Sequence, residues 1–366
     1  MNRDAASDRL SFAERLIVWQ NQHGRHDLPW QRTQDPYRIW LSEIMLQQTQ
    51  VNTVIPYYAR FLERFPDIET LAAAPGDSVL ELWAGLGYYA RARNLHRCAQ
   101  AVVAGHGGRF PETAEALDEL PGIGRSTAAA IAAFAFGQRT AILDGNVKRV
   151  LARCFGIEGF PGSAQSEKIL WTLAESLLPA TKIEAYTQGL MDLGATRCTR
   201  SKPFCTACPM HDICIARRTN RQAELPTAKP KKSVPERETN VLLLSDGPRV
   251  LLERRPPSGI WGGLLALPEV ALDAAESFAR RHGCRILDTQ TLAPLRHSFT
   301  HFRLTIHALH CTAQSTNRQA AEPGWEWLEL CDVEGAALPT PVRKLLRLLA
   351  NSAAKTAQTH RPVLAD

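Results

Sequence analysis

The segment LPGIGRSTAAAIAAF (residues 120–134) decides the fold of the N-terminal half of the chain. Its Gly-Ile-Gly turn, from Gly122 to Gly124, separates a short helix from one that begins near Ser126. Glycine allows a positive φ and a close approach of the backbone, and N–H groups at a helix start attract anions. The segment therefore predicts two helices joined by a hairpin over about 112–137, with Gly122, Gly124 and Ser126 near an anion such as a phosphate. The alternative is a tight interhelical turn without a ligand.

The hydrophobic pattern divides the chain in two. Apolar residues recur at helical spacing up to about residue 218, as in Leu41, Ile44 and Met45. The segment LPTAKPKKSVPERET (225–239) has the prolines and charges of a linker, and strand-like alternation follows it. We therefore expect a multidomain protein: an all-α domain over 1–224, an α+β domain over 240–350, and a disordered tail over 351–366.

Length and charge limit the function classes. A chain of 366 residues with a formal net charge of +6 fits two domains and a polyanionic partner. No apolar run approaches the roughly 20 residues of a membrane span, and the charged start MNRDAASDRL is unlike a secretion signal. We therefore expect no membrane partner and a cytoplasmic location.

Four of the nine cysteines form a cluster in the sequence. Cys198, Cys205, Cys208 and Cys214 follow the spacing Cys-x6-Cys-x2-Cys-x5-Cys, and arginines and lysines surround them. Four thiolates within 17 residues predict a metal centre, which could be zinc or [4Fe–4S] since both accept four sulfur ligands. The other five cysteines are expected to be small buried side chains.

Two carboxylates are candidate catalytic residues. Glu43 lies on an apolar helical stretch, where loss of water would raise its pKa towards that of a general acid. Asp144, in LDGNVKRV, is a predicted helix N-cap whose N–H donors would keep it ionised, with Asn146 two residues on. A surface glutamate and a purely structural cap are the alternatives.

Two further stretches suit contacts with bases. Gln48 and Thr49 belong to a polar run that interrupts apolar helices, and Leu86 and Tyr88 lie on a glycine-framed loop beside arginines. Such side chains can enter a base stack, although buried core aromatics explain the second stretch equally well.

Together these motifs resemble the MutY family, the adenine DNA glycosylases of the helix–hairpin–helix DNA glycosylase superfamily. The resemblance covers residues 10–350. It rests on the following segments: SEIMLQQTQV (42–51), GLGYYARARNL (85–95), LPGIG (120–124), LDGNVKRVLAR (143–153) and MDLGATRCTRSKPFC (191–205). It implies base excision repair of adenine mispaired with 8-oxoguanine or guanine in double-stranded DNA, and a [4Fe–4S] cluster on the four cysteines.

The resemblance also implies roles for single residues. Glu43 would protonate adenine, Asp144 would stabilise the sugar cation and Asn146 would orient the site. Gln48, Thr49, Leu86 and Tyr88 would contact or replace the lesion pair. Related lyases carry a lysine where this chain has Ser126, and a hydroxyl cannot form an imine, so we expect a monofunctional enzyme.

The C-terminal domain resembles the Nudix hydrolases of oxidised nucleotides. Gly263 and Glu269 match the opening of their motif, but Ser277-Phe278 and Arg281-His282 stand where further carboxylates are expected. The resemblance therefore implies a domain that recognises 8-oxoguanine without hydrolysis. Phe299, Thr300 and His301 match a Phe-Ser-His segment that contacts the lesion in adenine glycosylases.

Two other functions stay open at this stage. One is a bifunctional glycosylase/lyase for oxidised pyrimidines, and the other is a non-catalytic DNA-binding or redox-sensing cluster protein. We expect a monomer that is associated with the nucleoid through its binding to DNA. The sequence does not identify any other repair or replication protein as a partner.

Overall fold

The computed structural model describes residues 10–229, 234–256, 259–299, 301–316 and 323–359, with side chains up to Asn351. Packing divides the chain into two compact units. Unit 1 holds residues 1–73 and 94–231, and unit 2 holds residues 74–93 and 232–366. The predicted helical domain is thus interrupted, because the segment 74–93 packs with the C-terminal residues.

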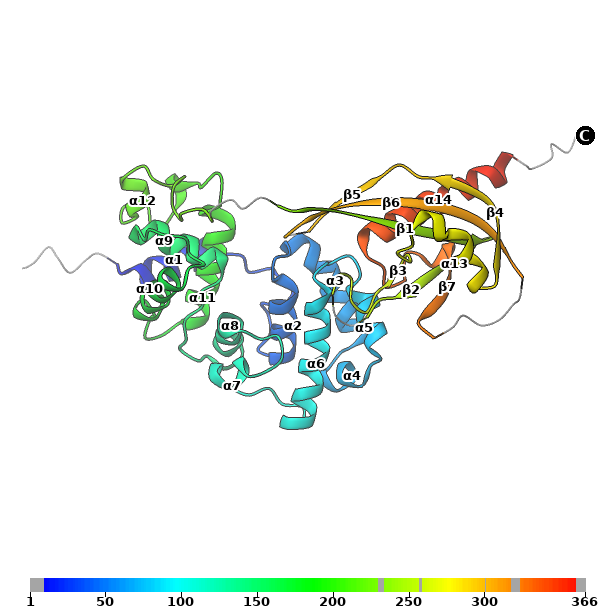
Figure 1. The fold of residues 1–366 in the computed structure, drawn as a ribbon. Helices are drawn as coiled ribbons and strands as arrows, with labels where there is room; N and C mark the ends of the chain where they lie inside the picture. Colours follow the sequence, from blue (N-terminus) through cyan, green and yellow to red (C-terminus); the bar gives the residue numbers. More distant parts are fainter. Residues whose placement is uncertain (1–9, 230–233, 257–258, 300, 317–322, 360–366) are drawn as a thin grey trace, which may run out of the picture. The chain divides into compact units, whose positions relative to one another are not determined.

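Unit 1 is helical (Figure 1). Its elements are α1 (Phe12–His23), α2 (Pro36–Leu46), α3 (Val51–Arg64), α4 (Ile68–Ala73), α7 (Ala114–Asp118), α8 (Arg125–Phe136), α9 (Gly145–Phe155), α10 (Ala164–Ser176), α11 (Ile183–Asp192), α12 (Ile215–Arg218) and the short η1 (Leu193–Arg197) and η2 (Cys205–Ala207). The helix α6 (Tyr89–His106) begins in unit 2 and continues in unit 1. The hairpin predicted over 112–137 is α7, the turn and α8.

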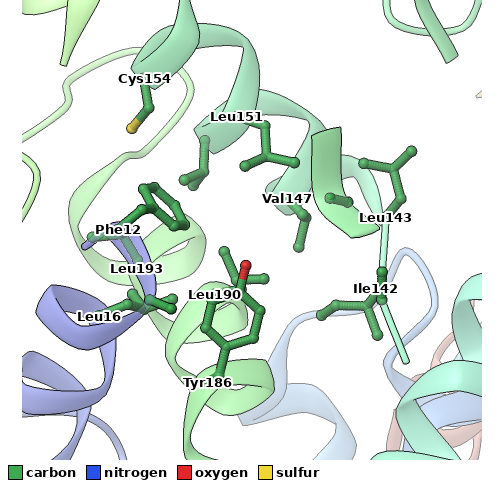
Figure 2. Packing of buried hydrophobic residues seen from close by; sticks show 14 of the residues in the cluster. Phe12, Leu16, Ile142, Leu143, Val147, Leu151, Cys154, Tyr186, Leu190 and Leu193 are labelled. Carbon is green, nitrogen blue, oxygen red and sulfur yellow. The ribbon is translucent and has the colours of Figure 1, made fainter. Parts of the chain in front are cut away.

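The core of unit 1 fixes the start of α9. Figure 2 shows Phe12 and Leu16 of α1 and Tyr186 of α11 facing the apolar side of α9. Leu143 is 3% exposed and Val147 is fully buried, so the residues on both sides of Asp144 are held in this core. A helix start fixed in this way positions its N-cap side chain precisely enough for chemistry.

Unit 2 is an α+β domain whose sheet lies between two helices. Its elements are α5 (Gly76–Trp83), β1 (Glu236–Asp246), β2 (Arg249–Arg254), β3 (Leu265–Ala266), η3 (Leu272–Ala274), α13 (Ala275–Arg281), β4 (Cys284–Thr291), β5 (Leu295–Ser298), β6 (Arg303–Ser315), β7 (Trp325–Glu329), η4 (Leu330–Asp332) and α14 (Thr340–Thr359). The strand order is β3-β2-β1-β6-β4; β5 also pairs with β6, and β7 with β2. β1 and β6 run parallel, while the other pairs are antiparallel.

The sheet has an apolar layer on each face. One layer joins β1 and β6 to Val342, Leu345 and Leu346 of α14, and the other joins the sheet to Phe278 and Ala279 of α13. The alternating stretch RHSFTHFRLTIHALH (296–310) does not form one strand: it is divided between β5 and β6, which pair antiparallel, and Phe302, which precedes β6, and Leu304 are buried.

Two element bounds differ from the sequence prediction. β1 begins at Glu236, inside the predicted linker, because residues from Glu236 onwards pair with β6 from Arg303 onwards. α14 runs to Thr359, past the predicted start of the tail at residue 351, since the alanine-rich sequence there favours a helix. The domain boundaries themselves stay predictions.

Candidate active site and cysteine cavity

Glu43 lies in the wall of an open pocket of about 1470 Å³ in unit 1. Asp35 caps α2 by accepting from the Tyr37 N–H, and Pro36 occupies the first helical turn. The neighbours Leu41 and Met45 are fully buried, whereas Glu43 keeps part of its surface open to the pocket. The helix therefore presents one carboxyl group from an otherwise apolar stretch.

The surroundings of Glu43 favour its protonated form. Burial, together with the nearby negative charge of Asp144, raises the pKa of Glu43 to about 8. A carboxyl group with this pKa carries a proton at neutral pH. A protonated carboxyl group is what a general acid requires, and the catalytic role of Glu43 stays a prediction.

Asp144 caps α9, as predicted. Its Oδ1 accepts a hydrogen bond of 2.7 Å from the Val147 N–H. Burial raises the pKa of Asp144, whereas backbone hydrogen bonds from Val147 and Asn146 and the charges of Arg149 and Lys148 oppose that rise. The sequence predicted only the lowering contribution, because the depth of the site depends on packing that a local pattern does not contain.

Ser126 has a packing role that the sequence did not predict. Its Oγ accepts a hydrogen bond of 2.9 Å from the Leu143 N–H, directly before Asp144. The hairpin is thereby tied to the segment that carries the carboxylate. The contact of Ser126 with an anion stays a prediction.

The two glycines of the hairpin differ. Gly122 has φ +80°, and a Cβ there would approach the Cβ of Asn94 to 2.5 Å, so its own fold requires glycine. Gly124 has φ −110°, and a Cβ there would meet nothing within 4 Å. Both are exposed while Ile123 between them is buried. Nothing in the packing explains glycine at 124.

The opposite wall of the pocket contains residues that the sequence analysis missed. Asp192 of α11 is fully buried and pairs with Arg25, with 2.7 Å between guanidinium and carboxylate. Gln188 donates to the same carboxylate at 2.9 Å, and Arg25 and Gln188 both line the pocket. Arg25 and Asp192 are 167 positions apart, so no spacing pattern could have paired them.

Gln48 and Thr49 lie at the turn between α2 and α3. Gln48 is exposed and has φ +57°, a conformation that side chains other than glycine rarely adopt. Gln47 donates to Thr127 Oγ1 of α8 at 3.4 Å, which connects this turn to the hairpin.

Tyr88 and Leu86 have opposite environments. Tyr88 is 46% exposed and has φ +49°, whereas Leu86 is 6% exposed. Trp83 holds the loop by donating from Nε1 to the Gly87 carbonyl at 3.1 Å, and the Arg91 guanidinium lies 5.3 Å from the Tyr88 ring centroid. Leu86 therefore packs inside the protein, and the predicted DNA contact of its side chain does not follow from this structure.

The four clustered cysteines line one cavity of about 400 Å³ in unit 1. Cys154, which the sequence analysis treated as an isolated core residue, lines it too. Among the described residues no three such side chains are close enough to hold one metal ion. Guanidinium groups also line this cavity. Four thiols around one cavity are the ligands that an iron–sulfur cluster requires. The residues present therefore fit that group.

Two arginines of α9 tie the cysteine loop to the active-site helix. Arg153 is 3% exposed and donates to the carbonyls of Leu225, Thr199 and Arg200 at 2.7–3.0 Å, and to Cys198 Sγ at 3.4 Å. Arg149 donates to the Cys198 carbonyl and to Asn146 Oδ1 at 2.7 and 2.8 Å. Arg149 is thus engaged within the protein. Asn146 is held by Arg149, and its orienting role stays a prediction.

Phe299 and His301 lie at the turn that joins β5 to β6. The Phe299 N–H donates to the Phe302 carbonyl at 2.9 Å, and the two rings stack with centroids 4.4 Å apart. His301 is exposed. Thr300 lies outside the described residues.

Glu269, the motif carboxylate of the Nudix hydrolases that this chain keeps, forms an ion pair within the protein. Glu269 pairs with Arg255, with 3.1 Å between guanidinium and carboxylate, and Phe278 is buried against the sheet. Within the part of the chain that the structure describes, no helix is long and apolar enough to cross a membrane.

Comparisons with known proteins agree with this geometry. The family model of the HhH-GPD superfamily base excision DNA repair proteins matches residues 41–176, and the NUDIX domain model matches residues 240–348. The adenine DNA glycosylase of Buchnera aphidicola subsp. Baizongia pistaciae is 37% identical over 92% of this chain and 96% of its own length. The human adenine DNA glycosylase is 34% identical over 94% of this chain and 75% of its own length.

A solved thermostable thymine-DNA glycosylase matches 57% of this chain and 95% of its own, with 33% identity and a TM-score of 0.53. The helical fold, the Nudix-like domain and relatives of 34–37% identity over more than nine-tenths of the chain point to one conclusion. The chain belongs to the adenine DNA glycosylases, the base excision repair enzymes that act on adenine in DNA.

Proposed function

We propose that this protein is a monofunctional glycosylase that hydrolyses the N-glycosidic bond of adenine mispaired with 8-oxoguanine, or with guanine, in duplex DNA. The observation that supports this most is the Glu43 carboxyl group, whose pKa burial and the nearby charge of Asp144 raise to about 8. Residues 1–224 would form the glycosylase domain and residues 240–350 the domain that recognises 8-oxoguanine.

The two carboxyl groups would divide the reaction. Glu43 gives its proton to N7 of adenine, the C1′–N9 bond breaks, and the sugar takes on positive charge. Asp144 stabilises that charge while Asn146 orients the site. Water then adds to C1′ and returns a proton to the Glu43 carboxylate. Asp144 accomplishes this as an anion, which its hydrogen bonds and the nearby Arg149 and Lys148 favour.

Two side chains near Asp144 in the described structure support a monofunctional reaction. Ser126 accepts from the Leu143 N–H, and a hydroxyl cannot form an imine. Lys148 is the neighbouring lysine in the sequence, and its amine pairs with Glu167 at 2.6 Å. Water is therefore the nucleophile that this site favours.

Recognition of the duplex would involve three exposed elements. Gln48 and Tyr88 hold positive φ values, a strain that proteins retain chiefly at functional positions, and both would enter the stack around the extruded base. Thr49 would contact the lesion pair beside Gln48. The hairpin would bind a backbone phosphate, because the empty space beside Gly124 at the start of α8 admits an external anion.

The cysteine cavity would hold a [4Fe–4S] cluster on Cys198, Cys205, Cys208 and Cys214. When bound, the cluster cross-links the loop and fixes its basic surface. In unit 2, Phe299 and His301 together with Thr300 would contact 8-oxoguanine.

The test is single-turnover cleavage of duplexes carrying adenine opposite 8-oxoguanine, guanine or thymine, with and without alkali, plus borohydride trapping. We expect breaks only after alkali, fastest opposite 8-oxoguanine, with little trapped adduct. Breaks without alkali and efficient trapping would instead establish the bifunctional reaction.

A further inference from the structure

One short segment of unit 2 contacts two loops that are proposed to bind DNA, the loop with Tyr88 and the turn at Phe299. Trp261 to Gly263 lie between β2 and β3. On one side they contact residues of the segment 74–93, which carries Tyr88. On the other side they contact the turn at Phe299.

The contact with the Tyr88 side is polar and close. Arg93 of α6 donates to the Gly262 carbonyl at 2.6 Å. Leu80 of α5 lies next to Gly263, where a Cβ would be in ordinary van der Waals contact with Leu80 Cδ1 at 3.5 Å. Tyr89, next to Tyr88, donates from its hydroxyl to the Leu338 carbonyl at 3.1 Å. The base of the Tyr88 loop is therefore fastened to the Nudix-like domain.

The contact with the Phe299 side is aromatic. The Trp261 ring lies 5.9 Å from that of Phe299 and 6.5 Å from that of His297, centroid to centroid. Phe299 in turn contacts His297 at 4.7 Å. Aromatic pairs at these separations hold ring orientation beyond what burial alone does.

The backbone of the segment is strained. Trp261 has φ +58° and Gly263 has φ +77°. For a bulky residue such as tryptophan this conformation costs free energy, and surrounding contacts must maintain it. The Leu264 N–H donates to the Trp261 carbonyl at 3.0 Å, and the Gly263 N–H donates to Arg255 and Pro256 carbonyls at 3.2 and 3.1 Å.

We propose that Trp261–Gly263 is a positioning bridge that fixes the spacing between the Tyr88 loop and the Phe299 turn, and thereby sets the preference for 8-oxoguanine over guanine opposite adenine. This rests on the proposed function. A lesion detected at Phe299 then biases how Tyr88 enters the stack. Arg93 and Trp261 are positioning residues that touch neither the adenine nor the reacting atoms.

The test measures a ratio of single-turnover rate constants, for adenine opposite 8-oxoguanine against adenine opposite guanine. In Trp261→Leu and in Arg93→Met we expect this ratio to fall about fivefold or more, with excision opposite guanine retained. Trp261→Phe should restore most of the ratio, because it keeps an aromatic ring. The double variant should lose little more than either single variant, since both act through one bridge.

Trp327→Leu is the matched control, because Trp327 of β7 packs with Arg249 and the apolar layer around Phe278, whereas Trp261 and Phe299 pack against the other layer. A 2-aminopurine beside 8-oxoguanine reports unstacking by its fluorescence. We expect that signal to fall in Trp261→Leu and to persist in Trp327→Leu. If Trp261→Leu does not fold, Arg93→Met and Trp261→Phe carry the test.

The outcomes separate the two proposals. A parent protein without preference for 8-oxoguanine would contradict the proposed function. A parent with that preference, and variants that keep it or a control that loses it equally, would contradict the bridge alone.

Discussion

The pocket of Glu43 and the cavity of the cysteines are built in opposite ways, although α9 lines the cavity and its N-cap Asp144 influences the pKa of Glu43. The pocket is wide and is lined by Glu43, whose pKa is raised to about 8 by burial and by the charge of Asp144. The cavity is small, and Arg153 beside it donates to three backbone carbonyls and a thiol. Acid catalysis requires a group that can release its proton, as Glu43 can. Holding a loop in place requires a group whose donor nitrogens all have hydrogen-bond partners, as Arg153 illustrates.

The contrast predicts that substitutions in the pocket impair catalysis and that substitutions at the cavity impair stability. Glu43→Gln should lower single-turnover excision by about 10²-fold or more, because the amide cannot supply the proton. Binding to the mispaired duplex should persist. Glu63→Gln, on the exposed face of α3, is the matched control. Comparable activity in both variants would remove Glu43 from the mechanism.

Asp144 has a proposed catalytic role and a structural role as the N-cap of α9, and two variants separate these roles. Asp144→Asn keeps a good N-cap and removes the charge, so excision should fall about 10²-fold with little change in melting temperature. Asp144→Ala should lose the same activity and in addition about 1 kcal/mol of stability. Thermal melts and single-turnover rates measure the two effects. Equal melting temperatures in both variants would argue against the capping role.

Arg153→Met tests the cavity side. Its removal leaves buried carbonyls of the cysteine loop unpaired, which should cost about 2–4 kcal/mol of unfolding free energy. Iron content and visible absorbance should fall with it, while the rate per iron-loaded molecule changes little. Arg218→Met, on an exposed arginine of α12, should be neutral in the same denaturant titration.

The pH dependence is the smallest expected effect. Since the protonated form of Glu43 is active and its pKa is about 8, the rate should fall about tenfold between pH 7 and 9. The pKa of Glu43 in the folded protein lies above the ordinary 4.5. The contribution of Glu43 to the free energy of unfolding is therefore fully present below pH 4.5 and is lost as pH rises through 8. Melting temperatures of the parent relative to Glu43→Gln should therefore decline over that range.

Local patterns predicted much of the fold. The hairpin around Gly122 and the change from helical to strand-like spacing after residue 239 depend on neighbours in sequence, and the structure contains both. Glu43 and Asp144 were identified by the same means, one as a carboxyl in an apolar helix and the other as a cap.

The parts that sequence reasoning missed depend on long-range packing. The pairing of Asp192 with Arg25, the acceptance of the Leu143 N–H by Ser126, and the burial of Leu86 all depend on which segments meet in three dimensions. The partners of Arg149 belong to the same group, because its donors are directed at the Cys198 carbonyl and the Asn146 amide oxygen.

The discontinuity of unit 2 has a consequence for the inheritance of this architecture. Residues 74–93 precede the linker by more than a hundred positions, yet Asp77, Tyr89 and Arg93 bind to Arg254, Leu338 and Gly262 of the C-terminal part. A recombination event at the linker would exchange only one side of these contacts. The Nudix-like domain and the segment 74–93 are therefore expected to change together over evolution, as two separate pieces of one inherited unit.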